Sequence, residues 1–197
     1  MSLNFQAIIA KHSDPFPAKM KRFIAPTKQS SGLELSWSYY AFAYERAFEI
    51  LVEEYAKRHP NQIYLHIPLM QTARHSMELA LKTALHECNH FTPESLKITG
   101  HNLLVLYDRL DDFLIGQGMI ELGDPWTKYS RNLLVHIDKF DPNGEVFRFP
   151  VDIVGFPFNA LDIDIEGLII AHHHITTLAD ATVTMLQDVG DYPYEFE

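Results

Sequence analysis

Apolar side chains recur at three- and four-residue steps in five separate stretches of this chain, and this repeat is the strongest constraint on its fold. One face of an α-helix repeats with that period, so each stretch predicts an amphipathic helix. The stretches span residues 36–59, 67–89, 103–116, 125–140 and 165–186. Each apolar face must be covered by another helix, which predicts an all-α fold, an antiparallel bundle of about five helices.

Local signals place several of the helix ends. Asp124 followed by Pro125 is a typical N-cap with proline in the first helical position, and Asp164 is a second cap candidate. The second helix is expected to stop near Asn89. Between the fourth and fifth helices, residues 145–151 and 158–163 alternate like strands and predict a small β-hairpin before the last helix.

The first 34 residues lack such a repeat and contain several prolines, so residues 1–34 are predicted to form an irregular arm and residues 35–197 one helical domain. The single cysteine, Cys88, lies on an apolar helix face, which favours a packed thiol in a reducing compartment. No apolar run reaches the roughly 20 residues that span a bilayer. We therefore expect a cytoplasmic protein without a membrane segment.

Charge is distributed unevenly along the chain, whose formal net charge is −10. Residues 1–34 carry five basic and two acidic side chains, whereas residues 120–197 carry four basic and fourteen acidic ones. An acidic body repels the phosphate backbone, which disfavours broad electrostatic binding of nucleic acid. Any contact with RNA would have to be made through a small local cleft.

A first group of candidate site residues lies on the second helix and at the start of the third. Arg74 and Glu78 are four residues apart on one helix face, and His75 is adjacent to Arg74. Together with His101 they could form a polar pocket between helices, which makes these four the candidate binding residues. The alternative is a salt-bridge ladder at the margin of the core, with His101 acting in a helix cap.

A second group, Arg131, Asn132 and His136, lies on the fourth helix. Arginine can hold a phosphate and histidine can transfer a proton near neutral pH, a combination that suits metal-independent RNA cleavage. A five-residue step turns a regular helix by roughly 140°, so Arg131 and His136 do not share a face, although Asn132 and His136 do. The alternative is a solvated helix face.

The histidines give weaker signals. His172, His173 and His174 are consecutive, so roughly 100° separates neighbouring side chains and they cannot share one metal on a regular helix. His86, Glu87 and His90 are a further candidate metal cluster, but they are expected to straddle a helix end without a firm ligand spacing. Neither a glycine-rich phosphate loop nor a paired-cysteine zinc motif is present. We therefore predict no metal and no cofactor.

The chain resembles the HEPN-like proteins, the superfamily of higher-eukaryote and prokaryote nucleotide-binding helical domains, over roughly residues 37–188. The resemblance is to a bacterial branch and rests on residues 73–82 (ARHSMELALK), on the Gly-His-Asn-Leu step at 100–103, on Asp141-Pro142, and on 147–152, where Phe149 replaces tyrosine. It implies a helical bundle that often dimerises. Members include RNA-cleaving toxins and defence effectors with an Arg, four to six residues and a His, which Arg131 and His136 match.

Two functions are therefore expected. The first is a helical module, in a bacterial defence or toxin–antitoxin context, that binds a partner protein or a nucleotide or RNA through Arg74, His75, Glu78 and His101. The alternative is a homodimeric, metal-independent endoribonuclease. In it His136 acts as general acid or base, Arg131 steadies the phosphate and Asn132 orients it.

Overall fold

The computed structural model describes residues 4–10, 36–58, 63–92 and 95–191, and within these ranges it is helical and contains no β-strand. The chain divides into two units, Met1–Gly32 and Leu33–Glu197. In the first unit the described residues form one short helix, α1 (Phe5–Ala10), whose preceding Asn4 accepts a hydrogen bond from the Ala7 amide. The arm predicted over residues 1–34 thus contains a short helix, and its residues 11–34 lie outside the described ranges.

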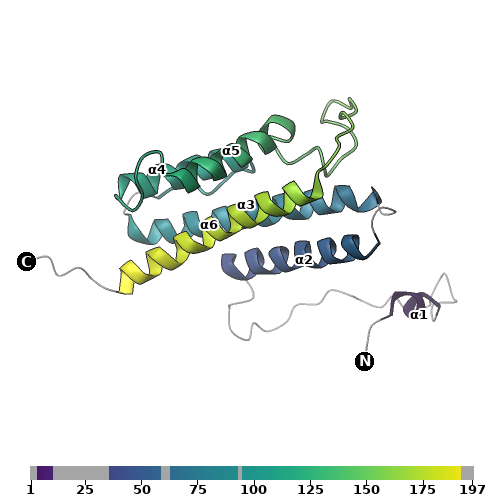
Figure 1. The fold of residues 1–197 in the computed structure, drawn as a ribbon, viewed down its shortest axis with the longest axis horizontal. Coiled ribbons are helices and arrows are strands. Elements are labelled where there is room, and N and C mark those ends of the chain that lie inside the picture. Colours follow the sequence, from purple (N-terminus) through teal and green to yellow (C-terminus); the bar gives the residue numbers. More distant parts are fainter. Residues whose placement is uncertain (1–3, 11–35, 59–62, 93–94, 192–197) are drawn as a thin grey trace, which may run out of the picture. The chain divides into compact units, whose positions relative to one another are not determined.

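The second unit contains the five long helices, which confirms the all-α prediction (Figure 1). None of the helices in the described ranges is both long and apolar enough to cross a bilayer. The helices are α2 (Trp37–Arg58), α3 (His66–Phe91), α4 (Leu103–Gly116), α5 (Pro125–Phe140) and α6 (Ile165–Asp191), and a 3-10 turn, η2 (Ile63–Leu65), leads into α3.

Helix α3 is the centre of the second unit, because it packs against α2, α4 and α6. Most of its apolar stripe is fully buried, and each buried leucine contributes roughly 1.5–3 kcal/mol by leaving water. The buried residues of the stripe include Leu69, Ala73, Leu81, Ala84, Leu85 and Cys88. Burial also raises the pKa of the Cys88 thiol to about 12, so this cysteine is an inert core residue, as predicted.

The helices are not all antiparallel. Helices α4 and α5 are antiparallel to each other. Tyr107 donates to the Thr127 carbonyl oxygen near one end of the pair, and Asn102 donates to Asp138 near the other. Helix α6, however, runs in the same direction as α3 (Figure 1). The cause is the segment before α4, which returns along α3 from Leu96, bonded to Asn89, to His101, beside Glu78. This return runs opposite to α3 without forming a helix. As a result α3 and α6 run parallel, and the predicted antiparallel arrangement is wrong for this pair.

The structure does not show the predicted hairpin. Its two halves meet only at an isolated antiparallel bridge between Val151 and Pro157. Proline supplies no amide donor, so Pro150 and Pro157 cannot extend a ladder. Instead Asp152 accepts hydrogen bonds from the Val154 and Phe156 amides at 2.9 Å each and closes a tight loop.

Most helix ends agree with the sequence signals, but α3 and α6 extend beyond them, and α6 continues to Asp191, five residues past the predicted stretch 165–186. Asp124 caps α5 as predicted, because its Oδ1 accepts from the Trp126 and Thr127 amides at 2.9 Å. Helix α3, in contrast, continues to Phe91, beyond the predicted stop near Asn89. His86, Glu87 and His90 therefore lie within the helix and do not straddle its end.

Candidate functional site

Arg74 is the centre of a buried ion network between α3 and the segments on either side of α4 and α5. The guanidinium is only 5% exposed. Its Nη2 donates to the His101 carbonyl oxygen at 2.7 Å, its Nη1 lies 3.5 Å from Glu78 Oε2, and its Nε lies 3.2 Å from Asp141 Oδ2. The last pair is close without hydrogen-bond geometry. Arg74 thus ties α3 to the end of the segment before α4, at His101, and to the start of the loop after α5, at Asp141.

The network is balanced in charge. Arg74 and Lys82 provide two cations, and Glu78 and Asp141 provide two carboxylates, all of them buried. Lys82 donates to Glu78 at 2.7 Å, while the second carboxylate, Asp141, accepts from the Glu145 and Val146 amides at 2.8 and 3.2 Å. A buried charge is tolerated when it is paired and hydrogen-bonded in this way. The interior of the network therefore acts as a structural anchor.

Glu78 connects this anchor to the surface. Burial alone would raise the pKa of Glu78, but the Lys82 ammonium and the contact with His101 outweigh burial and hold it below its ordinary value. His101 Nδ1 lies 2.9 Å from Glu78 Oε1, and the His101 side chain is 65% exposed. Within this network, His101 is the member that solvent or a ligand can reach.

Three of the four predicted binding residues, Arg74, Glu78 and His101, come together in this network. His75 does not, because it faces α2, where its ring packs edge-on against Tyr44 with centroids 4.4 Å apart. Burial lowers the pKa of His75 and favours its neutral form. Sequence spacing placed Arg74 and Glu78 on one face, but it could not identify Asp141, which lies 67 residues beyond Arg74.

The three predicted catalytic residues do not converge within this chain. Arg131 forms a two-pronged ion pair with Asp108 of α4, with Nε–Oδ1 and Nη2–Oδ2 distances of 2.8 and 3.0 Å. His136 instead packs against Phe140 and lines a cavity of about 500 Å³ beside α6 and the preceding loop. Asn132 is exposed. Arg131 is thus engaged toward α4 and His136 toward the α6 side of α5, as their helical spacing predicted.

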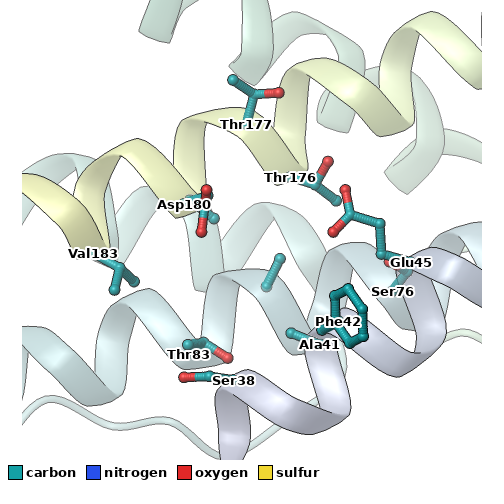
Figure 2. A pocket seen from close by; sticks show the side chains of 12 residues that line it. Ser38, Ala41, Phe42, Glu45, Ser76, Thr83, Thr176, Thr177, Asp180 and Val183 are labelled. Carbon is teal, nitrogen blue, oxygen red and sulfur yellow. The ribbon is translucent and has the colours of Figure 1, made fainter.

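A second hollow, which the sequence did not reveal, lies between α2, α3 and α6. It has a volume of about 300 Å³, and we name it the three-helix groove (Figure 2). Its lining combines hydroxyl groups, small apolar side chains and two carboxylates. The lining residues are Ser38, Ala41, Phe42, Glu45, Ser76, Ala80, Thr83, Thr176, Thr177, Ala179, Asp180 and Val183.

The carboxylates dominate the electrostatics of the three-helix groove. Glu45 of α2 is directed toward Thr176, while Asp180 projects from α6 (Figure 2). Burial raises the pKa of Glu45, and the nearby charges of Glu49 and Asp180 add to that rise, whereas the Thr176 hydroxyl opposes it. Among the described lining residues there is no lysine, arginine or histidine, although the nearby charge of His173, which contacts the lining residue Thr177, lowers the pKa of Glu45 and opposes part of its rise. The two carboxylates give the groove a negative character that attracts cations.

A buried polar contact lies under one end of the three-helix groove. Ser76 Oγ, which also lines the groove, is 2.9 Å from Nε2 of the buried His172 on α6. The ring of His172 packs against Phe48, the fully buried aromatic residue of α2. All three helices that form the groove thus meet at Ser76, His172 and Phe48.

The sequence did contain a signal for this groove. Ser76, Ala80 and Thr83 repeat at four and three residues on α3, and Thr176, Ala179 and Val183 do the same on α6. Such small and hydroxyl-bearing side chains allow helices to approach and leave polar space between them. Recognising them as one site requires knowing that α3 and α6 are parallel neighbours, which periodicity cannot show.

Comparison with known proteins gives no match for this chain. No family model, no curated protein and no solved structure is significantly similar to it. The resemblance to HEPN-like proteins thus stays a prediction from the sequence segments described above.

Proposed function

We propose that this chain is a helical binding module whose three-helix groove takes a ligand bearing a positively charged alkylamine. The observation that carries this proposal is the half-buried carboxylate of Glu45, which shares the groove with Asp180 and with no basic lining residue among those described. An ammonium group would neutralise the charge of one carboxylate, reduce the net charge of the pair and donate hydrogen bonds to carboxylate oxygens. The acidic lining favours an amine over the phosphates of a nucleotide or RNA.

The remaining lining fits the rest of such a ligand. Ala41, Ala80 and Val183 offer apolar surface for a methylene chain. The ring of Phe42 can take part in a cation–π contact, worth roughly 0.5–1 kcal/mol at an exposed position. The hydroxyl of Thr177 adds a further polar partner. Two sources share this chemistry: a free polyamine and a lysine side chain of a partner protein.

A thermal-shift titration tests the proposal and separates the two sources. Spermidine represents the free polyamine, and a lysine-containing peptide with blocked termini represents the protein. At 100 times Kd, binding stabilises the folded state by about 2.7 kcal/mol, which corresponds to a rise in Tm of roughly 5–10 °C for a chain of this size. The probe with the larger shift at equal concentration identifies the source.

Matched variants locate the effect. Glu45→Gln should abolish most of the shift, because it removes the charge and keeps the size of the side chain. Glu53→Gln, which removes an exposed charge from the same helix outside the groove, should leave it unchanged. If neither amine raises Tm, or if ATP or an RNA oligonucleotide raises it equally in the parent and in Glu45→Gln, the amine proposal is wrong.

The endoribonuclease alternative has less support. General acid–base catalysis requires the histidine and the phosphate-binding arginine to reach the same phosphodiester. Within one chain Arg131 is held by Asp108, and His136 lines a different surface. The endoribonuclease would therefore have to act as a homodimer in which Arg131 of one copy meets His136 of the other.

A further inference from the structure

The last turns of α3 carry two histidines with the spacing of a metal-binding helix. The segment reads His86-Glu87-Cys88-Asn89-His90, and α3 extends through all five residues. Residues four apart on a helix lie on one face, and the centroids of the two imidazole rings are only 5.2 Å apart. The sequence alone indicated this cluster, but it was set aside for lacking a firm ligand spacing, because α3 was expected to end near Asn89.

Glu87 completes a set of three donors. One ligand atom from each of His86, Glu87 and His90 can be chosen so that all lie within 4.8 Å of one another. His90 is exposed, and the other two are partly exposed, so an ion can reach them from solvent. In the part of the chain that the structure describes, none of the three side chains makes a hydrogen bond or an ion pair, so their donor atoms are free for a ligand.

The surroundings favour a cation. The three residues lie in the final turns of α3, where the helix dipole presents its negative end. The nearest basic side chain on the same helix, Lys82, is already paired with Glu78 on the buried side. Cys88 points into the core and is fully buried, so the thiol does not compete for the ion.

We propose that His86, Glu87 and His90 bind a divalent transition-metal ion of the zinc class. Imidazole nitrogens suit zinc, copper and nickel, and two histidines in an H-E-x-x-H helix are the ligand pair of many zinc sites. Three donors from the described residues leave one tetrahedral position for water or another ligand, an arrangement found in open zinc sites. This proposal does not depend on amine binding by the three-helix groove.

The site adjoins the three-helix groove along α3. Glu87 follows the groove residue Thr83 by four residues, a rise of about 6 Å along the helix. At the start of α2, Trp37 neighbours the groove residue Ser38, and its ring centroid lies 6.5 Å from that of His86. A bound ion would therefore lie near the end of the groove, and Trp37 can report its presence.

Zinc titration of the full chain, with any affinity tag removed, tests the proposal by calorimetry. The parent should bind one Zn²⁺ per chain. His86→Ala and His90→Ala should each weaken binding at least about 100-fold, because loss of even an outer-shell partner costs about 10–100-fold. His173→Ala, which removes an exposed histidine of α6, should bind as the parent does. Equal affinity in the parent and in His90→Ala, or an equal loss in His173→Ala, would overturn the proposal.

Fluorescence supplies a second readout that does not rely on affinity alone. The chain has two tryptophans, so Trp126→Phe leaves Trp37 as the only tryptophan, which excitation at the red edge of the tryptophan band selects over the tyrosines. Addition of Cu²⁺ should quench Trp37 with the same stoichiometry as zinc binding, and His86→Ala should remove the quenching. Circular dichroism verifies that each variant retains its helices. A folded Trp126→Phe chain that binds copper without quenching would place the ion elsewhere and contradict the proposed site.

Discussion

Gly144 lies directly against the guanidinium of Arg74, so close that a Cβ atom at Gly144 would stand 2.5 Å from Nη1. The backbone of Gly144 also has a φ of +77°, a conformation that other residues rarely adopt. Glycine is therefore required here twice, once for the turn after α5 and once for the space that Arg74 fills. The turn after α5 therefore covers the buried ion network at Arg74.

Gly144→Ala should destabilise the second unit by about 2–4 kcal/mol, since it adds an overpacking cost to the cost of a left-handed backbone. Gly155→Ala is the matched control, because Gly155 also has a positive φ, of +97°, but has no atom within 4 Å of an added Cβ. Urea unfolding of both variants measures the difference. Equal losses of stability in Gly144→Ala and Gly155→Ala would mean that contact with Arg74 adds no cost at position 144.

Arg74→Met should be more damaging than removal of an exposed arginine. It leaves Glu78 and Asp141 buried with less positive charge, and breaking a buried ion pair costs about 3–5 kcal/mol. Arg131→Met breaks the half-exposed pair with Asp108 and should cost less than about 1 kcal/mol. The free energies of unfolding of the two variants provide the comparison, and a similar cost for both would show that the network adds no stability.

His172 should make the protein acid-sensitive. Burial, with a smaller effect of His173, lowers its pKa from 6.5 to about 4, so the unfolded chain takes up this proton at a higher pH than the folded one. The stability is complete above pH 6.5 and is lost as the pH falls toward 4, by about 3 kcal/mol in total. His172→Gln, which cannot titrate but can still bond to Ser76, should flatten this part of the stability–pH curve. Parallel curves for parent and variant would contradict the assignment.

His136→Ala tests the ribonuclease alternative directly. Because His136 and Arg131 face different surroundings in one chain, we expect the parent to leave structured RNA uncut and the variant to behave identically. Gel analysis of RNA incubated with each protein in the presence of a metal chelator is the measurement. Cleavage by the parent that disappears in a folded His136→Ala variant would establish the nuclease and displace the binding proposal.

The sequence predicted those parts of the fold that depend on local chemistry. Each long helix follows from the spacing of its apolar residues, and Asp124 with Pro125 fixed the start of α5 because a cap acts within one turn. The hairpin was predicted from alternation alone. It fails to form because Pro150 and Pro157 withhold amide donors and Asp152 binds the loop to itself.

The candidate sites depended on distant parts of the chain and were harder to predict. Helix periodicity paired Arg74 with Glu78, but the partner Asp141 and the packing of Gly144 arise from how two loops meet α3. The three-helix groove requires α6 to lie parallel to α3, a result of the return of the chain before α4. Local patterns carry no information about that return.

The position of α3 at the centre of the helical unit gives the buried ion network a mechanical consequence. Arg74 and Glu78 hold one side of this helix, while Ser76, between them in sequence, lines the groove on another side. Any axial rotation of α3 that opened the groove would pull Arg74 from Asp141. The ion pairs therefore favour one axial orientation of α3, and with it the set of α3 side chains that lines the groove.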